Sequence, residues 1–332
     1  MRTLKIAYVD FWKTFQPDNF ILTKLLKKHF DLSISTDSPD FVICSNFGRD
    51  YLKYKCPRIY YSGESVAPDF NVYDYAIDFD NISFGDRYIC YPLCLMDEKL
   101  LSLTLQKDKN ALDSFHSKTG FCSYVVSADG GFGNRRDDLF DYICSYKMIA
   151  SGGRHKNNLP DGKGVADKLA FQKNYKFCLT CENSSFPGYT TEKIIDAFAA
   201  GSIPIYWGDP NIKLYFNEKA FINCLDYSSD EELLNRIKEI DNNDALYLEM
   251  LSEPAIHSDS LLIPMMEDAY LEDFILPIFN QNPADALRRN SAFTRNGKFH
   301  EHDLFRLNRI DDNAIVKKAK AIKRHFWGGK KL

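Results

Sequence analysis

The sequence predicts an α/β protein made of two doubly wound, Rossmann-like domains with a cleft between them. Short unbroken apolar runs alternate along the chain with segments whose apolar residues recur at helical spacing. Such runs are typical of parallel strands that helices cover on both faces. The length of 332 residues suits two domains of ordinary size.

The first alternating series begins with a strand at 5–11 and a helix at 19–30, which Asp18 or Asn19 can cap. Short apolar runs that indicate buried strands follow at 41–44, 58–61 and 73–77. The next stretch, 95–118, is charged and has no strong strand pattern. We therefore expect the linker between the two domains there.

The second series repeats the alternation. Strands are predicted at 121–127, 176–181, 203–207 and 220–224. Helices are predicted at 134–146, 167–174, 191–200, 230–240 and 244–251. The resulting division is an N-terminal domain at 1–116, a second domain at 117–285 and an extension at 286–332.

The end of the extension, residues 314–332, contains several lysines and no acidic residue. Apolar residues share one helical face there: Ile315, Val316, Ala319, Ile322, Phe326 and Trp327. A basic amphipathic helix of this kind binds anionic membrane surfaces. The alternative is a terminal helix that docks on the protein and exposes its lysines to solvent.

Composition excludes several classes of protein. The net charge is −4, with 42 basic and 46 acidic residues, which argues against a general nucleic-acid binder. No apolar run is long enough to span a bilayer, and the N-terminus is too polar for a signal peptide. We therefore expect a cytoplasmic protein, unless a targeting segment has been removed.

The nine cysteines are an odd number and lie in apolar surroundings, which indicates reduced thiols. Cys178 and Cys181 form a CxxC motif, but no second pair lies at zinc spacing. We expect buried thiols rather than a metal or redox site.

The segment 174–210 has the composition of a ligand site. A buried strand ends at Glu182 and Asn183, and the helix expected after the next loop has Glu192 and Lys193 in its first turn. Ligands of open α/β sheets bind beyond the carboxyl ends of strands, and helix N-termini favour anions. A nucleotide diphosphate fits this arrangement, with Glu192 accepting hydrogen bonds from a ribose. The alternative is an ordinary capped helix.

The same segment resembles a known family. The stretches YKFCLTCENSSFPGYTTEK and AFAAGSIPIYWGDP look like the signature of the α-1,3/4-fucosyltransferases, glycosyltransferase family 10. The resemblance extends to FCSYVVS with Asn134, Arg135 and Arg136, and to YYSGESVAPDFNVYDYAIDFD. It covers most of residues 58–250 and is strongest to the soluble bacterial members. The heptad repeats that many of those members have are absent here.

The resemblance implies a GT-B fold and inverting transfer of L-fucose from GDP-β-L-fucose to N-acetylglucosamine. The expected acceptor is the 3-hydroxyl, or alternatively the 4-hydroxyl, in an N-acetyllactosamine-type glycan such as a bacterial surface polysaccharide. Other hypotheses are a GT-B transferase that uses another nucleotide sugar, a glycosidase, and a non-catalytic glycan-binding protein. The resemblance implies no essential metal or other cofactor, and the oligomeric state stays open.

The family's motif positions assign a role to each candidate residue. Glu64 matches the proposed catalytic base, while Asp69 and Asp78 are read as structural or acceptor-contacting. Arg136, with Arg135 as its rival, and Lys193 would neutralise the diphosphate. The remaining donor-binding candidates are Asn183 and Tyr189 for the nucleotide, Glu192 for the ribose, and Glu182, which either contacts the fucose or braces the loop. The DxD letters at Asp78 and Asp80 resemble a metal motif but lie far from the nucleotide segment.

Overall fold

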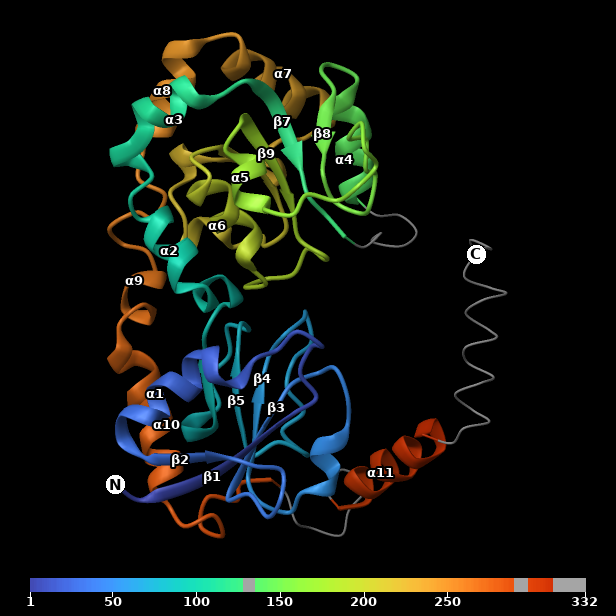
Figure 1. Ribbon diagram of the computed structural model, residues 1–332, viewed down its shortest axis with the longest axis vertical. Helices are drawn as coiled ribbons and strands as arrows, with labels where there is room; N and C mark the ends of the chain where they lie inside the picture. Colours follow the sequence, from blue (N-terminus) through green and yellow to red (C-terminus); the bar gives the residue numbers. More distant parts are fainter. Residues whose placement is uncertain (128–134, 290–297, 313–332) are drawn as a thin grey trace. The chain divides into compact units, whose positions relative to one another are not determined.

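The computed structural model describes residues 1–127, 135–289 and 298–312 (Figure 1). The chain divides into two compact α/β units. The first unit comprises Met1–Asp78, Ile82–Tyr91 and the described residues of 268–312, and the second comprises Phe79–Asn81 and the described residues of Pro92–Glu267. Each unit has its own parallel sheet.

The first unit contains a six-stranded parallel sheet in the order β2-β1-β3-β4-β5-β6. Its strands are β1 (Thr3–Val9), β2 (Asp31–Ile34), β3 (Phe41–Cys44), β4 (Arg58–Tyr61), β5 (Tyr75–Asp78) and β6 (Tyr88–Cys90). Its helices are α1 (Ile21–His29), α10 (Asp268–Asn280) and α11 (Lys298–Asp312). The three central strands β3, β4 and β5 are buried along their whole length, as unbroken apolar runs predict.

Helices cover one face of this sheet. The apolar side of α1 is buried through Leu22, Leu25 and Leu26. From α10, the ring of Phe279 packs against Phe41 of β3 with ring centroids 4.7 Å apart. The other face is buried under tyrosines of the connecting segments, and α11 adds Leu304 to that cluster.

A buried charge network fixes the C-terminal part of the first unit. Asp74, which directly precedes β5, accepts hydrogen bonds from the backbone N–H groups of Arg58, Arg288 and Arg289 at 2.7–2.8 Å. It also pairs with the Arg289 guanidinium. The buried Arg58 guanidinium donates to Glu301 of α11 at 2.6 Å. These pairs hold the chain after α10 against the amino ends of β4 and β5.

The second unit contains a five-stranded parallel sheet in the order β11-β10-β9-β7-β8. Its strands are β7 (Gly120–Tyr124), β8 (Ile149–Ser151), β9 (Tyr175–Cys181), β10 (Ile203–Trp207) and β11 (Ile222–Asn223). Its longer helices are α2 (Glu98–Thr104), α3 (Ala111–Ser117), α4 (Arg135–Cys144), α6 (Glu192–Ala199), α7 (Asp230–Asp241) and α8 (Asp244–Ser252). Two shorter ones are α5 (Lys168–Gln172) and α9 (Leu262–Met265).

Helices cover the second sheet on both faces (Figure 1). One core cluster contains residues of β7, β9 and β10 with the apolar sides of α4, α7 and α8. On the other face, α6 buries Ile194, Ile195 and Phe198, and α2 packs against α6. The strand order and the two helix layers make this unit doubly wound.

The order of the five strands in the second sheet is the same as that of the first five strands in the first sheet. In each, the first and third strands of the unit are neighbours, namely β1 with β3 and β7 with β9. The chain leaves these two strands toward opposite sides of the sheet, which makes each pair a topological switch point. Ligands of open α/β sheets bind outside the carboxyl ends of the strands at such a point.

The domain boundaries differ from the sequence-based expectation. The stretch 95–118 is not a linker, because it forms α2 and α3, which pack on the second unit. The first unit therefore ends its N-terminal part at Tyr91, and α10 belongs to the first unit rather than to the second. The expected cap of α1 is also wrong, because Phe20 occupies the N-cap position and no side chain caps it. The predicted basic helix at 314–332 lies outside the described residues.

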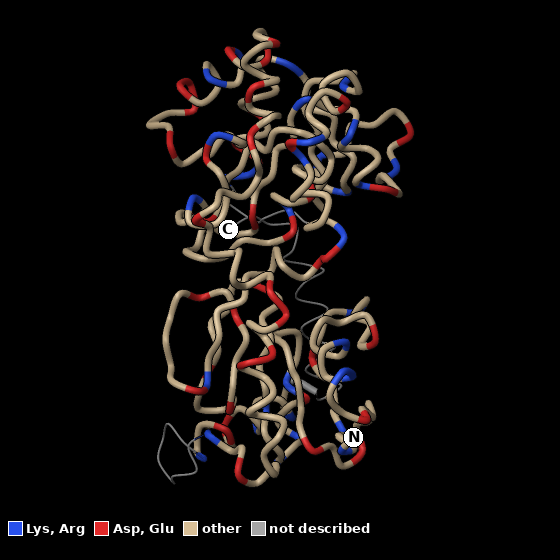
Figure 2. Tube along the Cα trace, turned by 90° about the vertical axis from the view of Figure 1, so that its left-hand side faces the viewer, with Lys and Arg blue, Asp and Glu red and all other residues tan. Residues whose placement is uncertain are grey.

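The structure also shows how the charged residues and the cysteines are distributed. Basic and acidic residues are interspersed along the described trace of both units (Figure 2). None of the helices in the described part of the chain is long and apolar enough to cross a membrane. All nine cysteines are free thiols. Cys178 and Cys181 are both buried, and Cys181 alone belongs to the core cluster on its face of β9.

Candidate functional site

The carboxyl end of β9 holds a buried carboxylate and its partners. Glu182 follows the strand and is completely buried. Its Oε1 accepts the backbone N–H of Thr191 at 2.8 Å, and its Oε2 accepts the Thr191 hydroxyl at 2.7 Å. The ammonium of Lys193 lies 2.9 Å from the same Oε2. Glu182 therefore ties the end of β9 to the start of α6.

This arrangement shapes the N-terminus of α6. Thr191 occupies the N-cap position, but its hydroxyl points to Glu182 and does not cap the helix. Lys193 donates to the Thr191 hydroxyl at 2.8 Å and is 17% exposed. Its positive charge is thus fixed beside the positive end of the helix dipole, where an anion is favoured.

A second cation reaches the same strand end from α4. Arg136 is buried, and its Nη1 donates to Oδ1 of Asn183 at 3.2 Å. Asn183 itself is exposed. Since Arg136 follows β7 and Asn183 follows β9, the pair lies at the switch point of the second sheet.

The two arginines that could contact the diphosphate, Arg135 and Arg136, differ in their side-chain partners. Arg135 forms a bidentate ion pair with Asp230, the first residue of α7. This pairing lowers the pKa of Asp230 and holds the Arg135 guanidinium against the start of α7. Arg136 is therefore the arginine placed at the candidate site.

Charges converge around the end of β9. Burial raises the pKa of the Cys181 thiol, at the last position of β9, and the Glu182 carboxylate adds to that rise. The positive charges of Arg136, Lys193 and Arg135 oppose it. Burial raises the pKa of Glu182, while the neighbouring Lys193 ammonium opposes that rise. Arg136 and Lys193, whose partners Asn183 and Glu182 directly follow β9, thus lie together with one buried carboxylate at this strand end.

The loop between β9 and α6 is held by a residue that the sequence reasoning did not assign. Asp209, just after β10, is completely buried and accepts the backbone N–H of Gly188 at 2.8 Å and the hydroxyl of Thr190 at 2.9 Å. It also accepts the backbone N–H of Asn211 at 2.8 Å. The sequence did contain a signal for this role, because Asp209 lies two residues after the strand, in the Gly208-Asp209-Pro210 sequence that ends the family-like motif.

Gly188 is the residue of this loop that must be glycine. Its φ is +83°, a conformation that L side chains rarely adopt. A Cβ atom there would lie 2.5 Å from the backbone oxygen of Phe79. The next residue, Tyr189, is buried and packs its ring against Phe79 at 5.2 Å between centroids. A nucleotide contact by Tyr189 stays a prediction.

The two remaining donor-site candidates differ in exposure. The Glu192 side chain is about half exposed and lies 3.9 Å from the Lys193 ammonium. It is therefore accessible, and its contact with a ribose stays a prediction. For Glu182, the contacts in the structure are those of a brace, and a direct contact with fucose also stays a prediction.

In the first unit, the predicted base lies after a central strand. Glu64 is partly exposed and follows β4 by two residues, at the carboxyl edge of the sheet. Asp69 accepts a hydrogen bond from His300 at 2.7 Å and from Asn71, which suits a structural role. Asp78 and Asp80, the DxD letters, are both buried. Among the described residues, no group of three His, Cys, Asp or Glu side chains could hold a metal ion.

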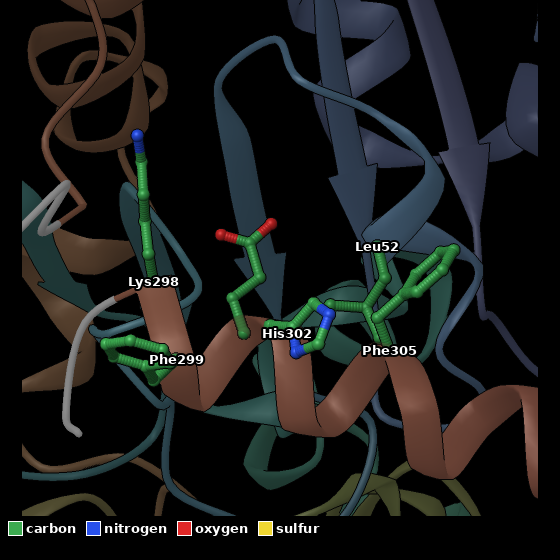
Figure 3. A pocket seen from close by; sticks show the side chains of 6 residues that line it. Leu52, Lys298, Phe299, His302 and Phe305 are labelled. Atoms are coloured by element: carbon green, nitrogen blue, oxygen red, sulfur yellow. The ribbon is translucent and has the colours of Figure 1, made fainter. Parts of the chain in front are cut away.

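Two hollows of the described surface lie elsewhere. One, of about 450 Å³, lies along α11 (Figure 3) and is lined by Leu52, Lys298, Phe299, Glu301, His302 and Phe305. The other, of about 320 Å³, is lined mainly by residues of α7, α8 and the segment 218–227. Neither contains a residue predicted from the sequence to act in the site.

Comparisons with known proteins match the chain to fucosyltransferases. Residues 6–96 match the model described as the alpha-(1,3)-fucosyltransferase FucT N-terminal domain, and residues 115–252 match glycosyltransferase family 10 (fucosyltransferase) C-term. The alpha-(1,3)-fucosyltransferase FucT of Helicobacter pylori is 32% identical over 298 residues, which cover 77% of this chain and 61% of that protein. The chain thus spans less than two thirds of that relative.

Solved structures are similar over most of the chain. A crystal structure of an α1,3-fucosyltransferase with GDP-fucose superposes with a TM-score of 0.72 and 26% identity, covering 87% of this chain and 94% of the other. A further α1,3-fucosyltransferase structure gives a TM-score of 0.76 at 27% identity, covering 88% and 93%. The predicted α/β fold of GT-B type is confirmed.

Proposed function

Because this chain belongs to glycosyltransferase family 10, we propose that it transfers L-fucose from GDP-β-L-fucose to an N-acetylglucosamine-containing glycan. The named relatives are α-1,3-fucosyltransferases, and one similar structure was solved with GDP-fucose. The proposed acceptor is the 3-hydroxyl, with the 4-hydroxyl as the alternative, in an N-acetyllactosamine-type glycan. A bacterial surface polysaccharide is the proposed natural acceptor.

One observation supports the donor assignment above all others. At the switch point of the second sheet, the hydrogen-bonded pair Arg136–Asn183 lies beside the braced Lys193 at the N-terminus of α6. Arginine presents a planar donor fork that matches phosphate oxygens, and lysine adds a point charge. A glycosidase needs two carboxylates in one pocket and no diphosphate-binding cations.

The proposed reaction inverts the donor carbon. Glu64 removes the proton of the acceptor hydroxyl as its oxygen forms a bond to C1 of fucose. The bond from C1 to the diphosphate oxygen breaks, and GDP leaves with the bonding electrons. Arg136 and Lys193 stabilise the negative charge that develops on the leaving diphosphate. Asn183, Tyr189 and Glu192 hold the nucleotide and its ribose, and Glu182 keeps Lys193 in place.

The proposal requires no divalent metal, because the two cations and the end of α6 can supply the positive charge. It places the protein in the cytoplasm, with residues 314–332 as a contact to anionic membrane on the inner face. Their lysines and shared apolar face support that contact.

A donor screen tests the function. The purified full chain is incubated with N-acetyllactosamine and GDP-fucose, GDP-mannose or UDP-galactose, and products are identified by mass spectrometry and linkage analysis. We expect a fucosylated product from GDP-fucose alone. A product from another donor would favour the second transferase hypothesis, and none from any donor would favour a non-catalytic glycan-binding protein.

The role of Glu64 is tested by Glu64→Gln, which keeps the side chain's size but cannot accept the proton. We expect kcat to fall by roughly 10²–10⁴, the usual contribution of a general base, while GDP affinity stays unchanged. Asp69→Asn is the matched control, because it alters a nearby acid that contacts His300. Near-normal turnover in Glu64→Gln would remove Glu64 from the mechanism.

A further inference from the structure

The first unit has a cluster of aromatic side chains at the carboxyl edge of its sheet. Trp12 lies in the segment after β1, and Phe47 lies just after β3. Their rings are 6.1 Å apart at an angle of 75°. Trp12 also packs edge-on against Phe11 and Phe15. This pair therefore occupies the switch point of the first sheet, where α/β folds bind ligands.

The exposure of the pair differs from that of an ordinary core cluster. Phe47 is 46% exposed, and Trp12 is partly exposed. By contrast, Phe20, which packs against Phe11 and Phe15 of the cluster, is buried. Its ring also packs edge-on against Tyr61, with ring centroids 4.8 Å apart. The cluster is thus anchored in the core on one side and presents aromatic surface to solvent on the other.

The backbone around Phe47 is held in a fixed conformation. Asp10 has a φ of +62°, which is uncommon for a residue with a side chain. Its carboxylate accepts the backbone N–H groups of Asp50 and Tyr51, both at 2.9 Å, and its carbonyl oxygen accepts the N–H of Phe47 at 3.0 Å. Asp10 therefore connects the segment after β1 with the segment after β3, and this fixes Phe47 before any ligand binds.

The pair is also adjacent to the turn that precedes the proposed base. A Cβ atom on Gly63 would lie 2.7 Å from the ring carbon Cε2 of Phe47, so the ring lies directly against this turn. The N–H of Gly63 donates to Oδ1 of Asn46 at 3.2 Å. Because Glu64 is the next residue, the aromatic surface and the proposed base belong to one connected set of loops.

We propose that Trp12 and Phe47 form the acceptor subsite, on which the apolar face of a neutral pyranose ring stacks. The ring that stacks is the sugar adjacent to the one that carries the reacting hydroxyl, such as the galactose of N-acetyllactosamine. Aromatic side chains provide large, rigid contact surfaces for such rings, and few polar groups are needed to orient them. The inference rests on the proposed function for its choice of substrate, and it assigns a role to Trp12 and Phe47, which lie outside the motifs quoted from the sequence.

The test uses variants of Phe47 with a matched control. Phe47→Ala should raise the acceptor KM for N-acetyllactosamine about three- to tenfold, with kcat and GDP affinity unchanged. Phe47→Tyr should restore the wild-type value, and Phe47→Leu should not. Phe84→Ala is the control, because Phe84 is 45% exposed in the same unit but precedes β6 at the opposite edge of the sheet. Trp12→Phe, which keeps an aromatic ring in the cluster, should have a smaller effect than Phe47→Ala.

The acceptor series separates stacking from general damage. With N-acetylglucosamine alone, which lacks the neighbouring sugar, Phe47→Ala and the wild type should have the same KM. An unchanged KM for N-acetyllactosamine in Phe47→Ala, or an equal loss in Phe84→Ala, would overturn the subsite.

Glycan binding without donor distinguishes this inference from the proposed function. Saturation-transfer NMR with N-acetyllactosamine measures binding directly in the wild type and in Phe47→Ala. Binding that depends on Phe47 without any fucosyl transfer would leave the subsite standing and reject the activity. Transfer without such dependence would reject the subsite alone, and neither binding nor transfer would reject both.

Discussion

Replacing Asp209 tests whether one buried carboxylate holds the donor loop. Asp209→Ala removes the acceptor for the N–H groups of Gly188 and Asn211 and for the hydroxyl of Thr190. Each buried polar group that loses its partner costs about 1–3 kcal/mol. Asn211 is only partly buried and can bond to water, so we count Gly188 and Thr190 and expect a loss of about 2–6 kcal/mol in the free energy of unfolding.

Asp209→Asn is the matched control for this change. Its side-chain oxygen can still accept both N–H groups, and its amide can donate to the Thr190 hydroxyl. We expect it to lose less than about 1 kcal/mol. Urea unfolding followed by circular dichroism measures the stability of both variants.

The effect on function is measured below the unfolding temperature. GDP affinity by calorimetry should fall about tenfold in Asp209→Ala, because the loop contains Asn183 and Tyr189, and stay near the wild-type value in Asp209→Asn. Stability within about 0.5 kcal/mol of wild type in Asp209→Ala would refute the hydrogen-bond reasoning. Lowered stability with unchanged GDP affinity would instead refute the link between this loop and the donor.

Three further predictions concern neighbouring contacts. Arg136→Ala and Lys193→Ala should each weaken GDP binding and lose about 2–4 kcal/mol of transition-state stabilisation. Arg135→Ala should leave the GDP affinity measured by calorimetry unchanged. Equal losses in all three variants would contradict the assignment of Arg136 and Lys193 to the diphosphate. Gly188→Ala should destabilise the fold by more than about 1 kcal/mol in urea unfolding, because its φ is positive and a backbone oxygen blocks the Cβ position, and a neutral result would count against the loop geometry. Arg135 lowers the pKa of Asp230, so this pair stabilises the folded state at pH values above the unfolded pKa near 3.9. The stabilisation is lost as the pH falls through the folded pKa of Asp230. Asp230→Asn should therefore lower the free energy of unfolding by less than about 1 kcal/mol above this pH range and flatten the acid limb of the curve of stability against pH.

The central strands and the donor segment could be predicted from the sequence because local pattern determines them. The apolar runs at 41–44 and 203–207 match β3 and β10 residue for residue. The segment around Glu182 and Lys193 was also predictable, because a strand end and a helix start a few residues apart must lie at the same edge of a sheet.

Features that depend on distant packing were not predictable. The short edge strand β2 is largely exposed, so its sequence has no apolar run to reveal it. The stretch 95–118 looked like a linker because α2 and α3 bury few residues, so their sequences are largely polar and show no clear apolar pattern. Asp209 was missed because its partners, Gly188 and Thr190, lie about twenty residues away, and only the folded loop shows that they share one acceptor.

The discontinuity of the first unit affects how the chain can fold during synthesis. The second unit is almost contiguous from Pro92 to Glu267, so it can complete its core soon after it leaves the ribosome. The first unit is synthesised earlier, but it must wait for α10, whose Phe279 covers Phe41 and whose last carbonyl groups accept hydrogen bonds from Arg2. Until then the part of the sheet face that α10 covers stays exposed in the nascent chain and is open to aggregation or to chaperones. The unit whose synthesis begins first is therefore the one that finishes last, and a chain that stops near residue 267 would lack part of its N-terminal domain rather than a dispensable tail.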